Sequence, residues 1–282
     1  MFVCPFCKSK VHFEREKASC ISCKRVFEKV KGFWNFMENK PSFYVHEDIL
    51  FQQEERGMKL RTERFYLPHI KKLFGDRKNL RILDSGCGTG RVVKELRKLN
   101  FQAFGIDVEA TRGHLWDNPN SFFFADGRSL PFENEFFDII ISFGVLEHVG
   151  VEGGKIDKEQ RRRYISESIR CLKRGGVLFI SFPSGAFPID FWHGGRWHMR
   201  FHLPFFDYTP NFWEMLKYFR NHSVEIKSLS PWEHLYFKTA SGRWYRYFIP
   251  FAMAWFISLK GPWENIITRF FSPFLVLIIR KL

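Results

Sequence analysis

A glycine-rich stretch in the first third of the chain constrains the fold more than any other feature of the sequence. Residues 82–91 read Ile-Leu-Asp-Ser-Gly-Cys-Gly-Thr-Gly-Arg, so a short apolar run ends in an acid and continues through three alternating glycines. A helical pattern follows directly, from Val92 to Leu99. Because glycine has no Cβ, such a turn lets backbone N–H groups lie close against a ligand. The stretch predicts a strand, a tight ligand-binding turn and a helix N-terminus.

The segments after this turn alternate between strand and helix patterns, which favours an α/β fold with a parallel sheet. Apolar runs that read as strands cover residues 81–84, 101–106, 121–124, 136–143 and 176–182, and helical patterns cover 92–99 and 155–173. Ligands in such sheets bind beyond the carboxyl ends of the strands. Gly86, Asp107, Asp126 and Phe143 stand at such ends, so we expect them around one ligand site.

The glycine turn alone leaves several nucleotide-binding families open. Nicotinamide- and flavin-binding domains have a similar turn, but their fingerprint is G-x-G-x-x-G. Here the spacing is G-x-G-x-G, and Arg91 stands where that fingerprint has its third glycine. With Asp84 two residues before Gly86, the pattern D-x-G-x-G-x-G resembles motif I of the class I S-adenosylmethionine (AdoMet)-dependent methyltransferases.

Two further motifs carry the same resemblance in the same order. Asp126 to Phe132 is similar to that family's D-x-x-x-L-P-F pattern, and Leu172 to Gly176 resembles its glycine turn into the fifth strand. The resemblance spans residues 81–182 and, more faintly, 200–230. It implies a Rossmann-like, seven-stranded class I methyltransferase sheet with helices on both faces, and an enzyme that takes a methyl group from AdoMet.

The resemblance also implies which residues bind the cofactor. The turn glycines would surround its methionine moiety, and Asp107 would accept hydrogen bonds from both ribose hydroxyls, for which two carboxylate oxygens are suited. Asp126 and Gly127 would border the adenine. The full expected set is Asp84, Gly86, Gly88, Gly90, Asp107, Asp126, Gly127 and Phe143.

Two C-x-x-C pairs near the N-terminus indicate a structural metal site. Their cysteines are Cys4, Cys7, Cys20 and Cys23, a spacing typical of a zinc ribbon. Four thiolates leave no open coordination position, and the ion would supply folding free energy to a segment with little apolar content. The segment resembles the ribbons that precede some bacterial and archaeal methyltransferase domains.

Candidate acceptor-side residues follow the fourth and fifth strands. Leu146 to Val149 resembles the x-x-L-E-H-V of methyltransferases that act on small molecules, including quinone and sugar O- or C-methyltransferases. His148 is a candidate base, because imidazole exchanges protons near neutral pH; packing and helix capping are its alternative role. In an insertion at 184–206, the expected acceptor-binding side chains are His193, Trp197, His198, Arg200 and His202.

A second metal is not expected in that insertion. The stretch 191–202 contains histidines without an accompanying carboxylate or cysteine. Upstream, residues 44–74 read as helical, and Pro68 is expected to divide them into two helices. Tyr44, Arg56 and Arg61 would reach the cofactor from there, or else belong to a solvated helix packed on the sheet.

The last forty residues extend beyond the family's pattern. Two apolar and aromatic runs, 244–259 and 266–279, are interrupted by Pro250, Arg269 and Pro273 and are too short to span a bilayer. They resemble interfacial segments, in which Trp, Tyr and basic residues lie at headgroup depth. Packing on the domain and dimerisation are the alternatives. Strands at 223–229 and 234–240 are expected to complete the sheet.

The expected organisation is therefore a zinc ribbon followed by a catalytic domain and an extension. The ranges are 1–40 for the ribbon, 41–243 for the methyltransferase domain with N-terminal helices at 41–78, and 244–282 for an aromatic, basic and helical extension. No signal peptide is recognisable, which predicts a cytoplasmic protein. The interfacial character of the last segment extends this prediction to a peripheral position on the inner face of the membrane.

Three functions are consistent with the sequence. The formal net charge of +14 implies an anionic partner. The preferred interpretation is methyl transfer to a small-molecule or lipid-linked acceptor, such as a quinone precursor or a lipid-linked glycan, at an anionic membrane surface. The alternative is a ribosomal RNA or other RNA methyltransferase whose ribbon contacts phosphates. A noncatalytic AdoMet-binding partner protein is the third.

Overall fold

The computed structural model describes residues 1–38, 48–109, 116–190, 193, 200–228 and 272–282. A seven-stranded sheet forms its centre, in the order β7-β6-β5-β8-β11-β15-β14. The strands are β5 (Arg81–Ser85), β6 (Gln102–Asp107), β7 (Phe122–Phe124), β8 (Phe137–Phe143), β11 (Leu172–Pro183), β14 (Val224–Ser228) and β15 (Phe274–Lys281). Five are parallel neighbours, and β15 is antiparallel to both β11 and β14. The strand order reverses between β5 and β8, which creates a crevice at their carboxyl ends.

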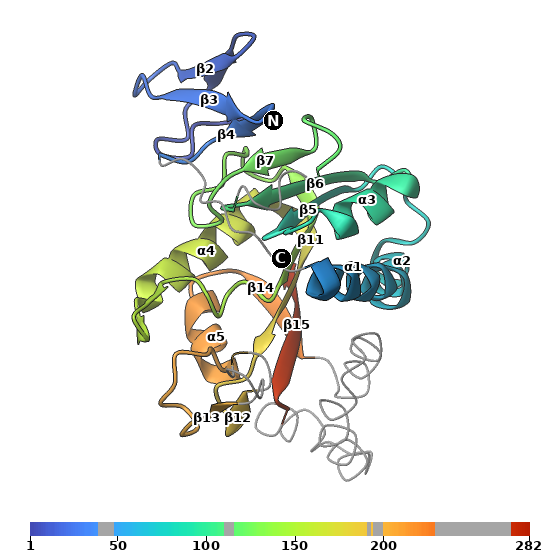
Figure 1. Ribbon diagram of the computed structural model, residues 1–282, viewed down its shortest axis with the longest axis vertical. Coiled ribbons are helices and arrows are strands. Elements are labelled where there is room, and N and C mark those ends of the chain that lie inside the picture. Colours follow the sequence, from blue (N-terminus) through green and yellow to red (C-terminus); the bar gives the residue numbers. More distant parts are fainter. Residues whose placement is uncertain (39–47, 110–115, 191–192, 194–199, 229–271) are drawn as a thin grey trace.

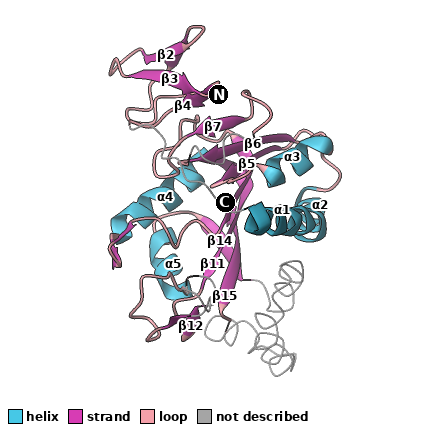
Figure 2. Ribbon diagram, viewed as in Figure 1, coloured by secondary structure: helices cyan, strands magenta, loops and turns pink. Residues whose placement is uncertain are grey.

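Helices cover both faces of this sheet, as Figures 1 and 2 show. On one face lie α1 (Asp48–Arg61), α2 (Leu67–Phe74) and α3 (Arg91–Lys98), and on the other lie α4 (Lys158–Cys171) and α5 (Phe212–Phe219). β7, β8 and β15 are mainly apolar because both of their faces are buried, whereas the edge strand β14 alternates apolar and polar residues. Along β8, Ile140 packs with Leu83 toward α4, whereas Ile139 and Ile141 pack on the opposite face. The expected α/β class is confirmed.

Pro68 does not break the helical segment. A π-helical turn at Thr62–Tyr66 joins α1 to α2, and the proline falls in the first turn of α2. A proline inside a helical run supplies no N–H to the preceding turn, and the π-helical turn lies directly before the point where this hydrogen bond is missing. The predicted division into two helices is therefore a π-helical turn between α1 and α2, and the whole segment is one continuous helical run.

The seventh strand comes from the end of the chain, which corrects the expected helical extension for these residues. β15 pairs with β11 from Phe274 opposite Pro183 to Arg280 opposite Val177. Leu277 and Ile279 are fully buried in it. A run that is apolar on both sides suits a central strand as well as a membrane surface, and periodicity cannot separate the two. The expected strand at 234–240 lies outside the described residues.

This pairing changes the place of the aromatic and basic segment in the fold. Since β14 precedes it and β15 follows it, residues 229–271 are an insertion between two strands of the sheet rather than a tail. The domain therefore includes the chain's last strand, beyond the expected boundary at 243. The remainder of the expected extension, 244–271, is not among the described residues.

The N-terminal ribbon continues the same sheet. It contains β1 (Val11–Phe13), β2 (Lys17–Cys20), β3 (Val26–Val30) and β4 (Phe33–Asn35), and β4 lies parallel to β7. Phe36 donates its N–H to the Phe124 carbonyl at 2.8 Å, and the Phe2 ring lies 5.0 Å from Phe123. The ribbon and the sheet thus share one hydrophobic core.

Candidate functional site

The glycine turn adopts backbone conformations that side chains disfavour. Gly86, Gly88 and Gly90 have φ angles of +84°, +53° and +77°. A Cβ on Gly86 would collide with the Val145 side chain, and one on Gly90 would lie 2.5 Å from the Phe122 ring. Both the dihedrals and the space therefore require glycine at these positions.

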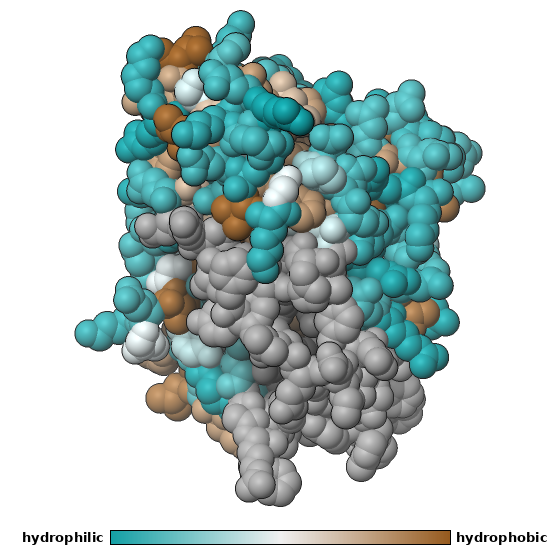
Figure 3. Space-filling model, turned by 45° about the horizontal axis from the view of Figure 1, so that its top comes forward, coloured by the Kyte–Doolittle hydropathy of each residue, from teal (hydrophilic) through white to brown (hydrophobic). Residues whose placement is uncertain are grey.

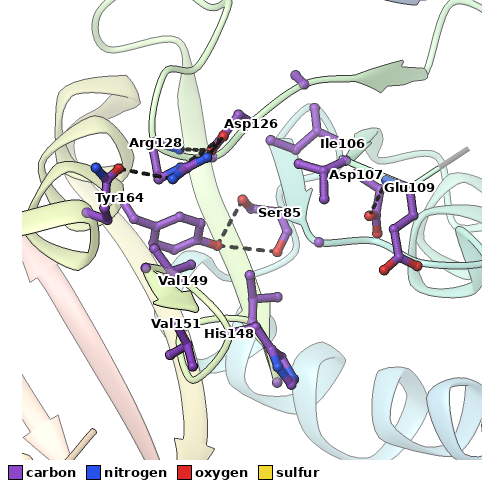
Figure 4. A pocket seen from close by; sticks show the side chains of 18 of the residues that line it. Ser85, Ile106, Asp107, Glu109, Asp126, Arg128, His148, Val149, Val151 and Tyr164 are labelled. Atoms are coloured by element: carbon purple, nitrogen blue, oxygen red, sulfur yellow. Dashed lines mark hydrogen bonds and ion pairs between the residues drawn. The ribbon is translucent and has the colours of Figure 1, made fainter. Parts of the chain in front are cut away.

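A cavity of about 760 Å³ lies at the carboxyl ends of the strands. This volume is in the range of small-molecule and cofactor sites. Ser85 and Gly86 line it from β5, Asp107 from β6 and Asp126 from the loop after β7, with His148 on the far side (Figure 4). The structure thus brings together five groups that come from four successive strands.

Asp107 connects the cavity to the glycine turn. Its Oδ2 accepts the Gly88 N–H at 2.7 Å, and its Oδ1 accepts the Glu109 N–H at 3.1 Å. Each carboxylate oxygen has a second lone pair that can accept a hydroxyl from a ligand. Glu109 also lines the cavity, and sequence reasoning did not single it out.

Asp126 lines the cavity with its carboxylate bound by Arg128. The Arg128 Nε lies 2.9 Å from each Asp126 oxygen, and Asp126 raises the pKa of the guanidinium. Next to it, a Cβ on Gly127 would collide with the ring of Tyr164. The Tyr164 hydroxyl bonds Ser142 Oγ at 2.7 Å and donates to Ser85 Oγ at 2.9 Å. Tyr164 and Arg128 are contributors that the sequence motifs did not reveal.

Four of the expected cofactor residues do not line this cavity: Asp84, Gly88, Gly90 and Phe143. Asp84 is buried behind the turn, where burial and then the charge of Asp107 raise its pKa to about 7, against the opposing effect of Arg61. The Arg61 guanidinium lies 3.3 Å from the centre of the Phe143 ring. Asp84, Arg61 and Phe143 therefore form a second cluster beside the same turn, with one acidic, one basic and one aromatic side chain.

Helix α1 is held on the glycine turn by Glu55. Its Oε1 accepts a hydrogen bond from the Thr89 hydroxyl, and its Oε2 lies 3.1 Å from Arg91 Nη1. Arg56 is exposed. Tyr44 lies outside the described residues. Of the three side chains expected to approach the site from these helices, the structure therefore places Arg61 beside it.

The acceptor side combines residues from two distant parts of the chain. Glu147 and His148 follow β8, and His193 follows the short strand β12 (Ile189–Asp190), which pairs with β13 (Arg200–Phe201). The His148 and His193 ring centres are 5.0 Å apart. Asp190 Oδ2 lies 2.7 Å from His193 Nδ1. Burial disfavours the charged imidazole, but the bond to Asp190 outweighs it and raises the pKa of His193.

Arg200 and His202, two of the expected acceptor-binding residues, lie beside this group, and each contacts acidic side chains. Arg200 donates to Asp207 at 2.8 Å and to Asp190 at 3.3 Å, and its guanidinium lies 4.4 Å from the Tyr208 ring centre. His202 Nδ1 lies 3.8 Å from Asp207 Oδ2. Both residues therefore contact the carboxylates that support the site. Trp197 and His198 fall outside the described residues.

The four N-terminal cysteines form a compact cluster. The Cys4 and Cys23 sulfurs are 3.6 Å apart, those of Cys7 and Cys20 are 3.3 Å apart, and all four lie within 4.8 Å of one another. Sulfurs around a tetrahedral zinc ion at about 2.3 Å would be roughly 3.8 Å apart. The backbone N–H of Ser9 is the main cause that lowers the pKa of Cys7 to about 6, which favours the thiolate. The cluster therefore fits a zinc ion.

Residues 83–180 match the family model described as a methyltransferase domain. This part of the chain is a class I AdoMet-dependent methyltransferase domain. The match is to the expected family, and this family implies AdoMet as the cofactor.

The curated relatives match less than half of the chain. A probable tRNA methyltransferase 9B of Mus musculus is 33% identical over 117 residues, which cover 40% of this chain and 24% of that protein. A ubiquinone biosynthesis O-methyltransferase of Bartonella quintana (strain Toulouse) is 29% identical over 110 residues, covering 36% of this chain and 41% of that protein. The chain thus spans between a quarter and two fifths of these relatives.

Solved structures of methyltransferases also resemble the chain. A putative sarcosine dimethylglycine methyltransferase from Galdieria sulphuraria is 14% identical, with a TM-score of 0.49, and the match covers 84% of this chain and 91% of that one.

Proposed function

We propose that the protein transfers a methyl group from AdoMet to a small, lipid-linked acceptor at a membrane surface. The observation that carries the proposal is that one cavity is bordered by cofactor-type groups on one side and by His148 on the other (Figure 4). His148 in turn faces the acceptor-side insertion through His193. Methyl transfer needs this arrangement, because donor and acceptor must be aligned for direct displacement.

In this proposal the residues of the cavity and the side chains beside the glycine turn would together hold the cofactor. Asp107 accepts the ribose hydroxyls, and Asp126 with Gly127 borders the adenine. Asp84 would bind the ammonium group and Arg61 the carboxylate of the methionine moiety, since their charges are complementary to those groups. Bound AdoMet would supply an activated methyl group.

The acceptor end of the cavity would handle the proton that an oxygen or carbon nucleophile loses. His148 lies at this end, and imidazole is suited to hold that proton near neutral pH. The fully buried Arg161 positions it indirectly, because its Nε donates to the Leu146 carbonyl at 3.1 Å. The loop that carries His148 is thereby fixed against α4.

A lipid-linked acceptor is supported by an exposed apolar loop next to this site. Phe201, Leu203 and Phe206 are 73%, 74% and 88% exposed, although the described surface in Figure 3 is mainly hydrophilic. Exposed apolar groups that cluster in this way mark interaction surfaces. The aromatic insertion at 229–271 adds Trp, Tyr and basic residues of interfacial character. Among the described residues, no helix is long and apolar enough to cross a bilayer.

The four-cysteine cluster would bind a structural zinc ion. It lies at the far end of the sheet from the acceptor side in Figure 1, and its four thiolates complete a tetrahedral site. Lys8 Nζ contacts Glu167 Oε2 on α4 at 2.7 Å, so the ribbon also braces the catalytic domain.

RNA methylation is the second candidate function, favoured by the sequence likeness to the probable tRNA methyltransferase. Several basic side chains of the ribbon are, however, paired with acids. Lys17 lies 3.4 Å from Glu28, and Lys29 lies 3.0 Å from Glu16. Paired charges release fewer counterions on binding a phosphate backbone, so this surface is a poorer RNA site than its lysine content indicates.

The deciding experiment incubates the full chain and methyl-labelled AdoMet with separate lipid, RNA and soluble fractions of a cell extract. We expect label in the lipid fraction, and none with Asp107→Ala, which removes the proposed ribose contact. Label in RNA alone would replace the proposal with the second candidate. Cofactor binding without label in any fraction would indicate the noncatalytic partner.

A further inference from the structure

We propose that Glu147, His148 and His193 form a binding site for one first-row divalent metal ion at the acceptor end of the cavity, separate from the cysteine cluster. One donor atom from each of the three residues lies within 4.8 Å of the other two. Two imidazoles and one carboxylate are a donor set that zinc, iron and related ions accept, with further positions left open.

An unpartnered oxygen in the cluster supports the presence of a cation. The Glu147 side chain is buried, with 3% exposure, and its Oε2 has no hydrogen-bond partner among the described residues. Leaving a carboxylate oxygen buried and unpaired is unfavourable, and an ion in the cluster would satisfy it.

His193 is already oriented as a metal ligand. Its Nδ1 lies 2.7 Å from Asp190 Oδ2, which leaves Nε2 for the cluster. A carboxylate on the second nitrogen fixes the tautomer and ring orientation of metal-binding histidines. Asp190 is itself 1% exposed and is held by Arg200 at 3.3 Å.

The sequence led to the opposite expectation because it separates the donors. Glu147 and His148 lie more than forty residues before His193, and the stretch 191–202 has no carboxylate of its own. Folding brings the two parts together, and β12 adds Asp190 behind His193.

The consequence for the reaction rests on the proposed function. An ion here would bind a hydroxyl oxygen of the acceptor and lower its pKa, so that the O–H proton passes to solvent. The oxygen would then form its bond to the methyl carbon while the sulfur–methyl bond breaks and the thioether keeps the electron pair. The acceptor class would be a phenol or another hydroxyl compound, and His148 would act as a ligand of the ion instead of holding the proton.

The test is a titration of the metal-free, full-length protein with Co²⁺, followed by absorbance. Thiolate ligands give cobalt an intense near-ultraviolet charge-transfer band, whereas imidazole and carboxylate ligands do not. We expect two bound ions, of which one lacks this band. The double variant Glu147→Gln/His193→Gln should lose that ion and keep the thiolate-bound one, while the control His222→Gln should keep both.

A graded variant tests the supporting contact. Asp190→Asn should weaken binding of the ion at Glu147, His148 and His193 by roughly 10- to 100-fold, as for other carboxylates behind a metal-bound histidine. Binding of the thiolate-bound ion should not change. The proposal is overturned if the wild type binds only the thiolate-bound ion, or if the double variant retains both. The thiolate band reports that the variants are folded. The titration measures metal binding and not methyl transfer. Its result therefore does not depend on whether the proposed function is correct.

Discussion

The carboxylate of Asp107 has two partners in the backbone and faces the cavity at the same time. It fixes the glycine turn through Gly88, and it lies where the resemblance to class I methyltransferases expects the ribose. A single side chain thus couples the shape of the turn to recognition of the ligand. Substituting Asp107 alone should therefore lower the affinity for AdoMet strongly.

We predict that Asp107→Asn weakens AdoMet binding by roughly 10- to 100-fold. The substitution removes a charge-assisted hydrogen bond of about 1.5–3 kcal/mol, and 1.4 kcal/mol corresponds to tenfold in affinity. Isothermal titration calorimetry measures the change. The exposed Asp117→Asn serves as the control and should bind like the wild type. Equal affinity of both variants would contradict the ribose contact.

Asp84 predicts a pH dependence of stability in the ligand-free protein. Burial raises its pKa from 3.8 to about 7, so the folded state binds more protons than the unfolded state between these values. The free energy of unfolding should therefore fall as the pH rises from about 4 to 7. Asp84→Asn should flatten this part of the profile, as measured by urea unfolding at several pH values. A variant whose slope equals that of the wild type would refute the assignment.

At the scale of secondary-structure elements, β15 decides how the domain closes. It lies between β11 and β14, and it completes the sheet although 45 residues, 229–273, separate it from β14 along the chain. Its side chains fill both faces, because Leu277 and Ile279 pack on the side of α4 and Val276 packs on the opposite side. The strand belongs to the core, whatever the preceding insertion does.

Truncating one of these side chains should destabilise the whole domain. Leu277→Ala is expected to lower the free energy of unfolding by about 2–5 kcal/mol, because it leaves a cavity in the centre of the sheet. Chemical denaturation followed by circular dichroism measures the loss. Leu282→Ala, five residues away and 61% exposed, should change stability by less than about 0.5 kcal/mol. If the two variants lost equal stability, β15 would not be a central strand.

At the scale of the molecule, the ribbon and the acceptor-side loop lie at opposite ends of one sheet (Figure 1). The ribbon shares the hydrophobic core and is tied to α4. The exposed apolar side chains lie in the loop after β13. In this arrangement the proposed lipid contact lies beside the proposed acceptor site, and the ribbon lies at the other end of the sheet.

Flotation with liposomes tests that orientation. The double variant Phe201→Ser/Phe206→Ser should bind vesicles of phosphatidylglycerol at least tenfold more weakly, since each buried phenylalanine contributes about 1.5–3 kcal/mol and 1.4 kcal/mol is tenfold. Val26→Ser, an exposed apolar residue of the ribbon, is the matched control and should float like the wild type. Deleting 244–271 tests the insertion while keeping β15 intact. Unchanged flotation in the double variant would exclude this loop as the contact.

The sequence by itself determined the features that depend on short spacing. The strand, glycine turn and helix around Gly86, the acids at Asp107 and Asp126 and the two cysteine pairs could all be predicted, because neighbours along the chain set the local conformation. It also predicted the α/β class, because apolar runs alternate with helical ones. These patterns were sufficient to place the cofactor-type groups on one edge of the sheet.

Only the tertiary structure decided the features that depend on long-range contacts. It showed that β15 is a central strand, because the identity of its neighbours and not its own pattern determines burial on both faces. It brought His193 to Glu147, and it placed Tyr164 of α4 beneath the cavity. No local pattern reports which distant side chains will meet, since packing of the whole sheet and its helices determines those distances.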